Sequence, residues 1–383
     1  MRYFLAGGAV RDILLGRTPT EFDIVFDGTP EDMVRQHGEL RQIGKTAVTY
    51  LVNGRDHTPL LGSITENLLA RDFTINALLL DENGIIHALP QTFADMRDGI
   101  LRHASPQAFL NDPARIFRLA RLTATLPGFS ICPETMRLMQ KAAEGEAIHA
   151  LSAERVGKEC MKAMAGHSPG NFLHVLSLAS ALSPWFSPWE KGESVPAGPA
   201  LYHGDNSVLD HTRIVMDKLA TMPLSLNDRP LAVWMGLCHD LGKLTTLPER
   251  LPRHIGHESR GKALAQKLAR LLRLPRRWEK AGCLAALLHM KAGQYHLLRP
   301  ATKVDLLHTL AVSRLASPFI ALVVADSGNA ALYGQMTQDM QTILAVTLPE
   351  QWRGKGTVSG EVLRHLRIVA LQSSTGSGQK LHP

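Results

Sequence analysis

Near its start the chain reads YFLAGGAVRD, residues 3–12, in which a short apolar run meets two adjacent glycines and then a polar helix start. The apolar run predicts a β-strand. Glycines at the end of a strand let backbone N–H groups approach a phosphate, and the start of the following helix adds partial positive charge. The stretch therefore predicts a strand, a turn and a helix that cradle a phosphate, with Gly8 in the turn and Arg11 in the helix.

The next short motif, EFDIV at residues 21–25, holds two carboxylates two positions apart. On a β-strand, alternation sends the side chains of Glu21 and Asp23 to the same face, where they can share divalent metal ions. Taken separately, paired glycines commonly mark a plain turn, and an E-x-D pair commonly marks a solvated strand face. A phosphate cradle followed closely by a carboxylate pair, however, is what metal-dependent nucleotidyl transfer requires.

Composition narrows the class of protein. The 383 residues, 45% of them hydrophobic, are enough for about two to four domains with real cores. A net charge of +7 favours a polyanionic partner. The cysteines are dispersed without a CxxC pair, which indicates reduced core thiols. With neither a signal peptide nor an apolar run long enough to cross a membrane, we expect a cytoplasmic protein. The sequence does not fix its oligomeric state.

The spacing of apolar residues changes along the chain. Residues 1–90 mix short β-type runs with helices, whereas helical spacing dominates from about residue 104 onward. We therefore expect an α+β fold in which a mixed head precedes a long all-α body. The expected segments are a head (1–103), a helical neck and body (104–182), a Pro/Trp/Gly-rich linker (183–199), a second helical domain (200–350) and a tail (351–383) that is disordered from Leu371.

A second polar cluster lies where the mixed pattern gives way to the helical one. ARDFTINAL (70–78) runs from a basic turn into a predicted strand, and NDPARIFRLAR (111–121) begins a helix with Asp112 near its N-cap. Asp112, Arg115 and Arg118 recur every three residues and so lie along roughly one helix face. The common explanation is a solvated face with local ion pairs. Alternatively, an Asp and an Arg in rigid positions can recognise the edge of a base.

Together these motifs resemble those of the class II tRNA nucleotidyltransferases of the polymerase β superfamily, which include the CCA-adding enzymes and bacterial poly(A) polymerases. The likeness reaches to about residue 370 and points to the bacterial multifunctional CCA proteins. Its carriers are LAGGAVRD (5–12), EFDIVF (21–26), RDFTINAL (71–78), the spacing Asp95-x-x-x-Gly99-x-x-Arg102, NDPARIFRLAR (111–121) and LSAERVGKE (151–159). The resemblance implies a polymerase β-type nucleotidyltransferase head, then an all-α body and an all-α HD domain.

The resemblance also implies roles for the matching positions. Glu21 and Asp23 would hold catalytic Mg²⁺, which activates the primer 3′-hydroxyl and stabilises the leaving pyrophosphate. Asp112 and Arg115 would act as an amino-acid template that selects CTP and then ATP. The residues that would bind the nucleotide are Gly8, Arg11, Arg71, Asp112, Arg115 and Arg118. The partner implied by the family is the acceptor end of tRNA, gripped by its shape.

The chain departs from the family pattern at several positions. Glu21 stands where the family usually has Asp, and Ala70 where it usually has Arg. The stretch between Val52 and Arg71 is considerably shorter than in typical members. A short stretch here leaves a transferase that adds only CC or only A as an alternative to full CCA addition. A poly(A) polymerase is a further alternative within the same superfamily. Asp95 and Arg102 match residues that help the family's head switch between C and A addition.

The second strong motif is CHDLGK, residues 238–243, at the end of an apolar helical stretch. It resembles the HD phosphohydrolase superfamily, and the metal ligands would be His211, His239, Asp240 and Asp326. Imidazole and carboxylate ligands suit Ni²⁺, Mn²⁺ or Mg²⁺, and metal-bound water is a ready nucleophile for phosphate esters. The family implies activity on 2′,3′-cyclic and 2′-phosphates.

Three downstream histidines, His254, His257 and His289, either face the substrate, bind a second ion or are ordinary polar residues. We favour the ordinary interpretation for His289. A basic stretch, residues 267–277, either touches RNA phosphates, with steep salt dependence, or is a solvated amphipathic face. One alternative belongs to another class of function, an RNA-binding HD hydrolase with an inactive head.

Overall fold

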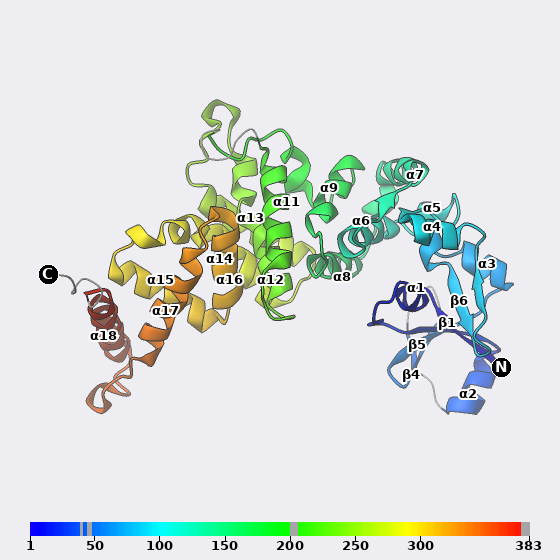
Figure 1. Cartoon of the computed structure of the whole chain (residues 1–383), viewed down its shortest axis with the longest axis horizontal. Helices are drawn as coiled ribbons and strands as arrows, with labels where there is room; N and C mark the ends of the chain where they lie inside the picture. The colour runs from blue at the N-terminus through cyan, green and yellow to red at the C-terminus, as the bar shows by residue number, and fades with distance from the viewer. Residues whose placement is uncertain (39–40, 44–47, 200–205, 377–383) are drawn as a thin grey trace. The chain divides into compact units, whose positions relative to one another are not determined.

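The computed structural model describes residues 1–38, 41–43, 48–199 and 206–376 (Figure 1). It divides into two compact units. The first, the N-terminal unit, takes residues 1–119, 126–151 and 179–181; the second, the C-terminal unit, takes residues 120–125, 152–178 and the described residues from 182 onward. The division falls within helix α6 (Arg115–Thr125).

The N-terminal unit is built on a sheet with the spatial strand order β3-β4-β5-β2-β1-β6-β7. Its strands are β1 (Arg2–Ala6), β2 (Asp23–Asp27), β3 (Arg41–Ile43), β4 (Thr49–Val52), β5 (Arg55–Pro59), β6 (Leu78–Asp81) and β7 (Ile86–Ala88). β1 and β2 are antiparallel with Ala6 opposite Asp23, so the end of β1 lies beside the start of β2. β2 and β5 are parallel, which puts the starts of both strands at the same edge of the sheet.

Alternating side chains give the sheet a core on each face. Phe4 and Val25 belong to one buried cluster, which also holds Leu68 from helix α3 (Ile64–Leu69). Phe26, next to Val25, belongs to the other cluster together with Met33 from helix α2 (Pro30–His37). The short strands are therefore fixed in register, because a slip of one residue would exchange the two faces.

Local capping signals define the helices around the sheet. Helix α2 begins at Pro30, and α3 begins after Ser63; both have a capping box in which side chain and backbone satisfy each other. The remaining elements of this unit are α1 (Gly8–Leu14), α2 (Pro30–His37), α3 (Ile64–Leu69), η1 (Thr74–Asn76), α4 (Thr92–Asp98), β8 (Ile100–Leu101), α5 (Ala108–Asn111), α6, β9 (Ser130–Ile131), α7 (Pro133–Ala143) and η2 (Glu146–Ile148). The strand that we expected within residues 70–78 begins only at Leu78, because residues 74–76 form the tight turn η1.

The C-terminal unit is helical, as the spacing of apolar residues predicts. Its elements are α8 (Ala153–Met164), α9 (Gly170–Leu178), η3 (Ser187–Lys191), α11 (Val208–Thr221), α12 (Arg229–Cys238), η4 (Leu241–Thr245), η5 (Pro248–Arg250), α13 (His257–Leu271), α14 (Arg276–Gly293), η6 (Tyr295–Leu297), α15 (Pro300–Ser313), α16 (Ala316–Ser327), α17 (Ala331–Ala345), η7 (Glu350–Trp352) and α18 (Thr357–Gly376). Residues 231–238 of α12 are all buried, so this helix forms the centre of the unit. Among the helices of the described residues, none combines the length and the apolar character that crossing a lipid bilayer requires.

Two expectations about the organisation of the chain are wrong. The segment at 183–199 is not a linker, since Trp185, Phe186 and Trp189 are buried and Phe186 packs edge-on against Phe172 of α9. Its aromatic content belongs to a core rather than to a spacer. Disorder also does not begin at Leu371, because α18 extends to Gly376; residues 377–383 lie outside the described part of the chain.

Gly242 of η4 permits a close approach between η4 and α13. A Cβ atom at this position would lie 1.9 Å from the carbonyl oxygen of His257 and 2.6 Å from the amide nitrogen of Gly261. Both neighbours are backbone atoms, so neither can move aside without shifting the helix. The glycine of the CHDLGK motif therefore sets the distance between this motif and α13.

We predict that Gly242→Ala lowers the free energy of unfolding by about 1–3 kcal/mol, the usual cost of overpacking a filled interior. The matched control is Gly334→Ala in α17, where nothing lies within 4 Å of the added Cβ, so that helix propensity should leave stability unchanged or raise it. Urea unfolding of both variants measures the difference. Equal stabilities of Gly242→Ala and Gly334→Ala would contradict the close approach of η4 and α13.

Candidate functional site

The glycine turn and Asp23 meet at one edge of the sheet. Gly7 ends β1 with a left-handed φ of 67°, a conformation that glycine adopts without strain, and its N–H donates to the carbonyl of Leu78. α1 begins at Gly8. The predicted strand, turn and helix are thus present, and the register of β1 with β2 places Asp23 beside them.

Asp23 stands among other charged groups. Partial burial raises its pKa, and the carboxylates of Glu21 and Asp56 raise it further, whereas Arg118 and Arg71 oppose the rise. Concentrated negative charge of this kind favours a divalent cation. Glu21 itself lies just before β2, so the two carboxylates do not share a strand as we expected.

Asp56 is a third carboxylate at this edge that we did not identify from the sequence. It lies in β5 directly opposite Asp23, in parallel register, so both side chains lie on the same face of the sheet. The Asn53-Gly54 pair is a hairpin signal that predicts β4 and β5. Nothing local, however, predicts that β5 pairs with β2.

Arg11 and Arg71 lie over the glycine turn from two directions. The buried guanidinium of Arg11 donates to Asn76 Oδ1 over 2.6 Å and to Asp12. Arg71 Nη1 lies 3.1 Å from the position of a Cβ on Gly7, and Arg71 Nη2 donates to Asn67. The structure therefore brings together the glycine turn and two of the predicted triphosphate contacts.

Asp72 links the first turns of α6 to this edge. Its carboxylate is buried, accepts hydrogen bonds from the Phe73 amide and the Asn76 side chain, and lies 2.8 Å from Arg118 Nε. Burial alone would raise the pKa of Asp72, but Arg118 and these hydrogen bonds lower it. Arg118 is thereby fixed near Asp23.

Arg115 and Asp112, the predicted template pair, both make hydrogen bonds with the backbone. Arg115 donates to the backbone carbonyls of Ala70 and Arg71, over 2.6 and 3.1 Å. Asp112 Oδ1 accepts from the Ala114 amide, which matches the capping role that we expected at the start of α6. Both residues therefore stand beside the turn that carries Arg71.

Asp95 and Arg102, whose spacing matches the family pattern, form an ion pair in the N-terminal unit. Asp95 is buried in α4, and Arg102 Nε donates to both of its oxygens over 3.0 and 3.2 Å. The hydroxyl of Thr74 donates to the same carboxylate. Together these contacts connect η1 and α4 with the residue that follows β8.

The four predicted HD ligands converge in the C-terminal unit. His211 of α11 places Nε2 3.0 Å from Asp326 Oδ1 of α16, and 3.3 Å from His239 Nε2. His239 Nε2 is in turn 3.2 Å from Asp240 Oδ2. Ligand atoms from three separate elements therefore face one another.

The charges of this cluster fit a metal ion. Burial opposes the protonation of His239, but Asp240 and Asp326 raise its pKa to about 10. Asp240 is completely buried. Lys243 Nζ lies 2.8 Å from its Oδ2, but neither oxygen accepts a hydrogen bond. Burial of a carboxylate is costly, and a divalent cation held with the two imidazoles would stabilise it further.

The three downstream histidines separate into two kinds. His254 is occupied by hydrogen bonds, with Nδ1 2.9 Å from Thr246 Oγ1 and Nε2 2.8 Å from the carbonyl of Pro196. His257 and His289 instead place their Nε2 atoms 3.6 and 3.4 Å from Asp240 Oδ1. The ring of His289 is buried against the HD carboxylate, and our ordinary interpretation of this residue stays a prediction.

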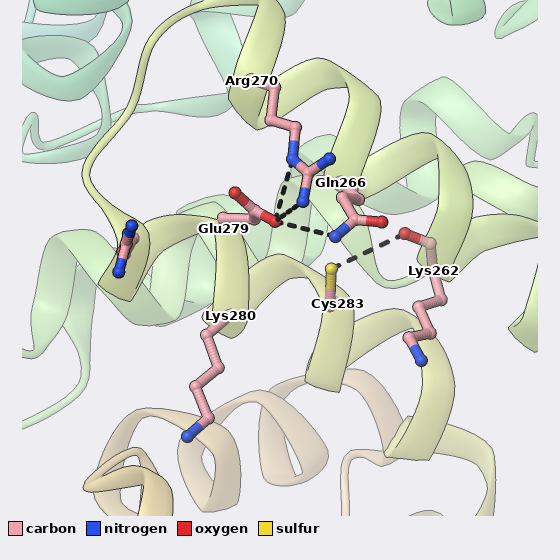
Figure 2. A pocket seen from close by; sticks show the side chains of 7 residues that line it. Lys262, Gln266, Arg270, Glu279, Lys280 and Cys283 are labelled. Carbon is pink, nitrogen blue, oxygen red and sulfur yellow. Dashed lines mark hydrogen bonds and ion pairs between the residues drawn. The ribbon is translucent and has the colours of Figure 1, made fainter.

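The basic stretch at 267–277 is largely neutralised within its own unit. Arg270, Arg273 and Arg277 pair with Glu279, Glu154 and Asp228, respectively. Figure 2 shows the pocket beside it, about 430 Å³ in volume, where Gln266 and Arg270 meet Glu279. The remaining residues that line the pocket are Lys262, Arg276, Lys280 and Cys283. The positive charge of the pocket thus comes from side chains on both α13 and α14.

Comparison with known proteins agrees with the two sites. Residues 3–57 match the family described as "Poly A polymerase head domain", and residues 208–317 match "HD domain". A "Multifunctional CCA protein" of Nitrosomonas eutropha is 36% identical over 86% of this chain and 83% of its own length. One of Acinetobacter baumannii (strain ATCC 17978) is 34% identical over 100% of this chain and 99% of its own.

Solved structures share the fold. A Bacillus stearothermophilus CCA-adding enzyme in complex with CTP has a TM-score of 0.65 at 20% identity, covering 97% of this chain and 89% of that one. A Thermotoga maritima CCA-adding enzyme complexed with tRNA has a TM-score of 0.58 at 18% identity, covering 99% and 92%. The expected fold class, a polymerase-type head followed by helical segments and an HD domain, is confirmed.

We predict that Asp72→Asn lowers the free energy of unfolding by about 1–3 kcal/mol near neutral pH, because it leaves charged and polar donors without their carboxylate. The folded state lowers the pKa of Asp72. Its contribution is therefore fully present above the pKa of the unfolded state, about 3.9, and is lost as the pH falls through the lower folded-state pKa. The difference between the two proteins should shrink in acid.

Urea unfolding of both proteins between neutral pH and pH values below the ordinary Asp pKa measures this difference. The control is Asp98→Asn, which removes an exposed ion pair with Arg97 and should change little at any pH. If the loss of unfolding free energy in Asp72→Asn does not change with pH, the charge of Asp72 is not the source of its contribution to stability.

Proposed function

The chain belongs to the family of the multifunctional CCA proteins, and from this premise we propose that it adds or repairs the 3′-terminal CCA of tRNA from CTP and ATP. The observation that carries the proposal is the group of charges around Asp23. Glu21 and Asp56 concentrate negative charge beside it, while Arg71 and Arg118 add positive charge. Carboxylates for metal ions next to cations for phosphates are the parts that nucleotidyl transfer uses.

We assign the chemistry of the head to these residues. Asp23 and Glu21 would hold Mg²⁺, which when bound activates the primer hydroxyl and neutralises the departing pyrophosphate. The amides of the glycine turn at Gly8 would face the triphosphate, and the guanidinium groups of Arg11 and Arg71 over this turn would orient it. The hydrogen bond from Arg11 to Asn76 supports a preorganised position.

Selection of the base is assigned to the start of α6. Asp112 and Arg115 would accept from and donate to the base, and Arg118 would support the nucleotide. The attachment of Arg115 to the turn at Ala70 and Arg71 supports a rigid template. The same hydrogen bonds occupy some of the N–H donors of Arg115, so Asp112 would carry much of the discrimination between the bases of CTP and ATP.

The HD domain is assigned a second activity, metal-dependent hydrolysis of 2′,3′-cyclic and 2′-phosphates. His211, His239, Asp240 and Asp326 would hold a divalent ion such as Ni²⁺, Mn²⁺ or Mg²⁺, which supplies an activated water. The convergence of these four side chains and the orphaned oxygens of Asp240 support the assignment. The proposed organisation is a head over residues 1–103, a helical body over 104–182 and an HD domain over 200–350.

Extension of a tRNA transcript that lacks its 3′ CCA tests the head activity. With Mg²⁺ and both nucleotides, we expect the wild-type chain to add the full CCA, and Asp23→Asn to slow incorporation about a hundredfold or more. Asp27→Asn is the matched control, because Asp27 lies at the other end of β2 and pairs with Arg2. It should extend at the wild-type rate.

Separate reactions with CTP alone and ATP alone distinguish the remaining alternatives. A wild-type product that stops after the C residues would identify a partial-specificity transferase. A long A tail would identify a poly(A) polymerase. Failure to extend any primer would contradict the proposal and leave an RNA-binding HD hydrolase.

Hydrolysis assays test the second activity independently. After chelation and reloading with Ni²⁺, Mn²⁺ or Mg²⁺, we expect the wild-type chain to cleave 2′,3′-cyclic AMP and a 2′-phosphate. His211→Ala should abolish this cleavage and keep CCA addition, whereas Asp23→Asn should do the reverse. Cleavage that survives His211→Ala would place the hydrolase elsewhere.

A further inference from the structure

The pocket of about 430 Å³ between α13 and α14 stands apart from both proposed active sites (Figure 2). Its lining runs from Lys262 to Arg270 on α13 and from Arg276 to Cys283 on α14, and we call it the basic pocket. These side chains differ from those that we assign to the head and to the HD metal, so neither proposed activity uses them. A hollow of several hundred cubic ångströms is typical of sites that hold small molecules.

The carboxylate of the basic pocket is neutralised by its own neighbours. Glu279 Oε1 accepts hydrogen bonds from Arg270 Nε and Nη2, over 3.1 and 2.9 Å, and from Gln266 Nε2 over 2.8 Å. The hydrogen bonds from Arg270 are the main cause that lowers the pKa of Glu279. Because Glu279 and Arg270 satisfy each other, they leave the remaining cations of the pocket uncompensated.

Those remaining cations are Lys262, Arg276 and Lys280. Among the residues that the structure describes, none of the three forms an ion pair with a carboxylate. Arg276 is also the first residue of α14, whose N-cap residue Pro275 makes no side-chain capping bond. The start of a long helix adds partial positive charge of its own. Three cationic side chains and a helix start at one hollow favour an anion.

Helical spacing and close packing hold these cations in place. The lining residues of α13 recur every four positions, as do Arg276 and Lys280 on α14, so each set follows one stripe of its helix. Next to Lys262, a Cβ at Gly261 would lie only 3.2 Å from Ala286 of α14. The two stripes are therefore carried by helices that pack tightly against each other, which makes the site rigid.

The charges around the pocket favour a compact anion over an RNA strand. Proteins that follow a nucleic-acid strand line its backbone with a continuous basic groove. Here Arg273 and Arg277, on either side of the start of α14, pair with Glu154 and Asp228 over 2.6 and 2.9 Å. The basic stretch is thus interrupted beside the pocket, where a strand would need it to continue.

We propose that the basic pocket binds a small anion of two or three linked phosphates, with Lys262, Arg276 and Lys280 as its cationic contacts. Ammonium groups attract phosphate oxygens as point charges, and a guanidinium group can donate two hydrogen bonds to them. Inorganic polyphosphates and the tails of nucleoside triphosphates share this chemistry. The site is separate from the transferase and hydrolase activities proposed above.

Cys283 provides a local readout of the pocket. It lines the pocket and is partly exposed, whereas Cys132, Cys160 and Cys238 are buried. Its thiol lies 3.7 Å from the backbone carbonyl oxygen of Lys262. A ligand in the pocket should therefore shield Cys283 from alkylation, and the other three thiols should stay unreactive throughout.

The test measures how fast N-ethylmaleimide, an uncharged reagent, alkylates Cys283 in the full chain. The protein is first stripped of metals and desalted, so that bound ions cannot recruit phosphates, and mass spectrometry follows the peptide that contains Cys283. We expect inorganic triphosphate to slow alkylation severalfold and saturably, and sodium chloride at equal ionic strength to have no such effect. Tighter binding of ATP or CTP than of triphosphate would identify a nucleotide as the ligand, and equal or weaker binding a bare polyphosphate.

Lys280→Gln should raise the triphosphate concentration that gives half-maximal protection about tenfold or more, because it removes one charged contact. The matched control is Lys267→Gln, which removes the same charge from an exposed position of α13 outside the pocket lining. It should keep the wild-type value. Buried thiols that remain unreactive show that each variant is folded.

Failure of triphosphate to protect Cys283 would overturn the proposal. An equal loss of protection in Lys280→Gln and Lys267→Gln would overturn it too, because it would indicate a general effect of charge. Protection by a tRNA transcript but not by triphosphate would assign the pocket to RNA instead. The measurement involves no turnover, so these results are independent of the tests of the head and the HD domain.

Discussion

A carboxylate buried away from water must be compensated by positive charge or hydrogen-bond donors, and this constraint shapes both sites. Asp72 meets it within the protein, through two hydrogen bonds and the guanidinium of Arg118. Asp240 meets it only in part, because Lys243 lies at one oxygen and neither oxygen accepts a hydrogen bond. The first carboxylate is therefore a structural link, whereas the second is the one at which we propose a metal ion.

The two sites differ in how tightly they can keep a metal. Asp23 stands at an exposed sheet edge among carboxylates and arginines, where an ion is readily exchanged and where triphosphate oxygens can complete its coordination. Asp240 and its histidines are buried, and imidazole ligands bind transition ions more strongly than carboxylates alone. The two proposed metal sites therefore differ both in burial and in the type of ligand that they offer.

Local sequence predicts local geometry well and long-range pairing poorly. The strand, glycine turn and helix of residues 3–12 were predictable, because each part has its own signal within a few residues. Asp56 was not, since its place beside Asp23 depends on the parallel pairing of β2 with β5. The packing of 183–199 was hidden for a related reason, because proline and glycine indicate a loop while the buried tryptophans depend on distant partners.

The same limit explains why the approach of His257 and His289 to Asp240 was not predicted. It also shows why the motif contains a glycine. Gly242 does not have a left-handed φ, so its backbone conformation does not require glycine. Glycine is required because the backbone of His257 leaves no room for a Cβ atom. An HD dipeptide supplies two ligands whatever surrounds it. How closely further imidazoles approach this carboxylate depends on the packing of the next helices, and here that distance is set by the absence of a Cβ at Gly242. The surroundings of the motif are thus a consequence of helix packing as much as of the motif itself.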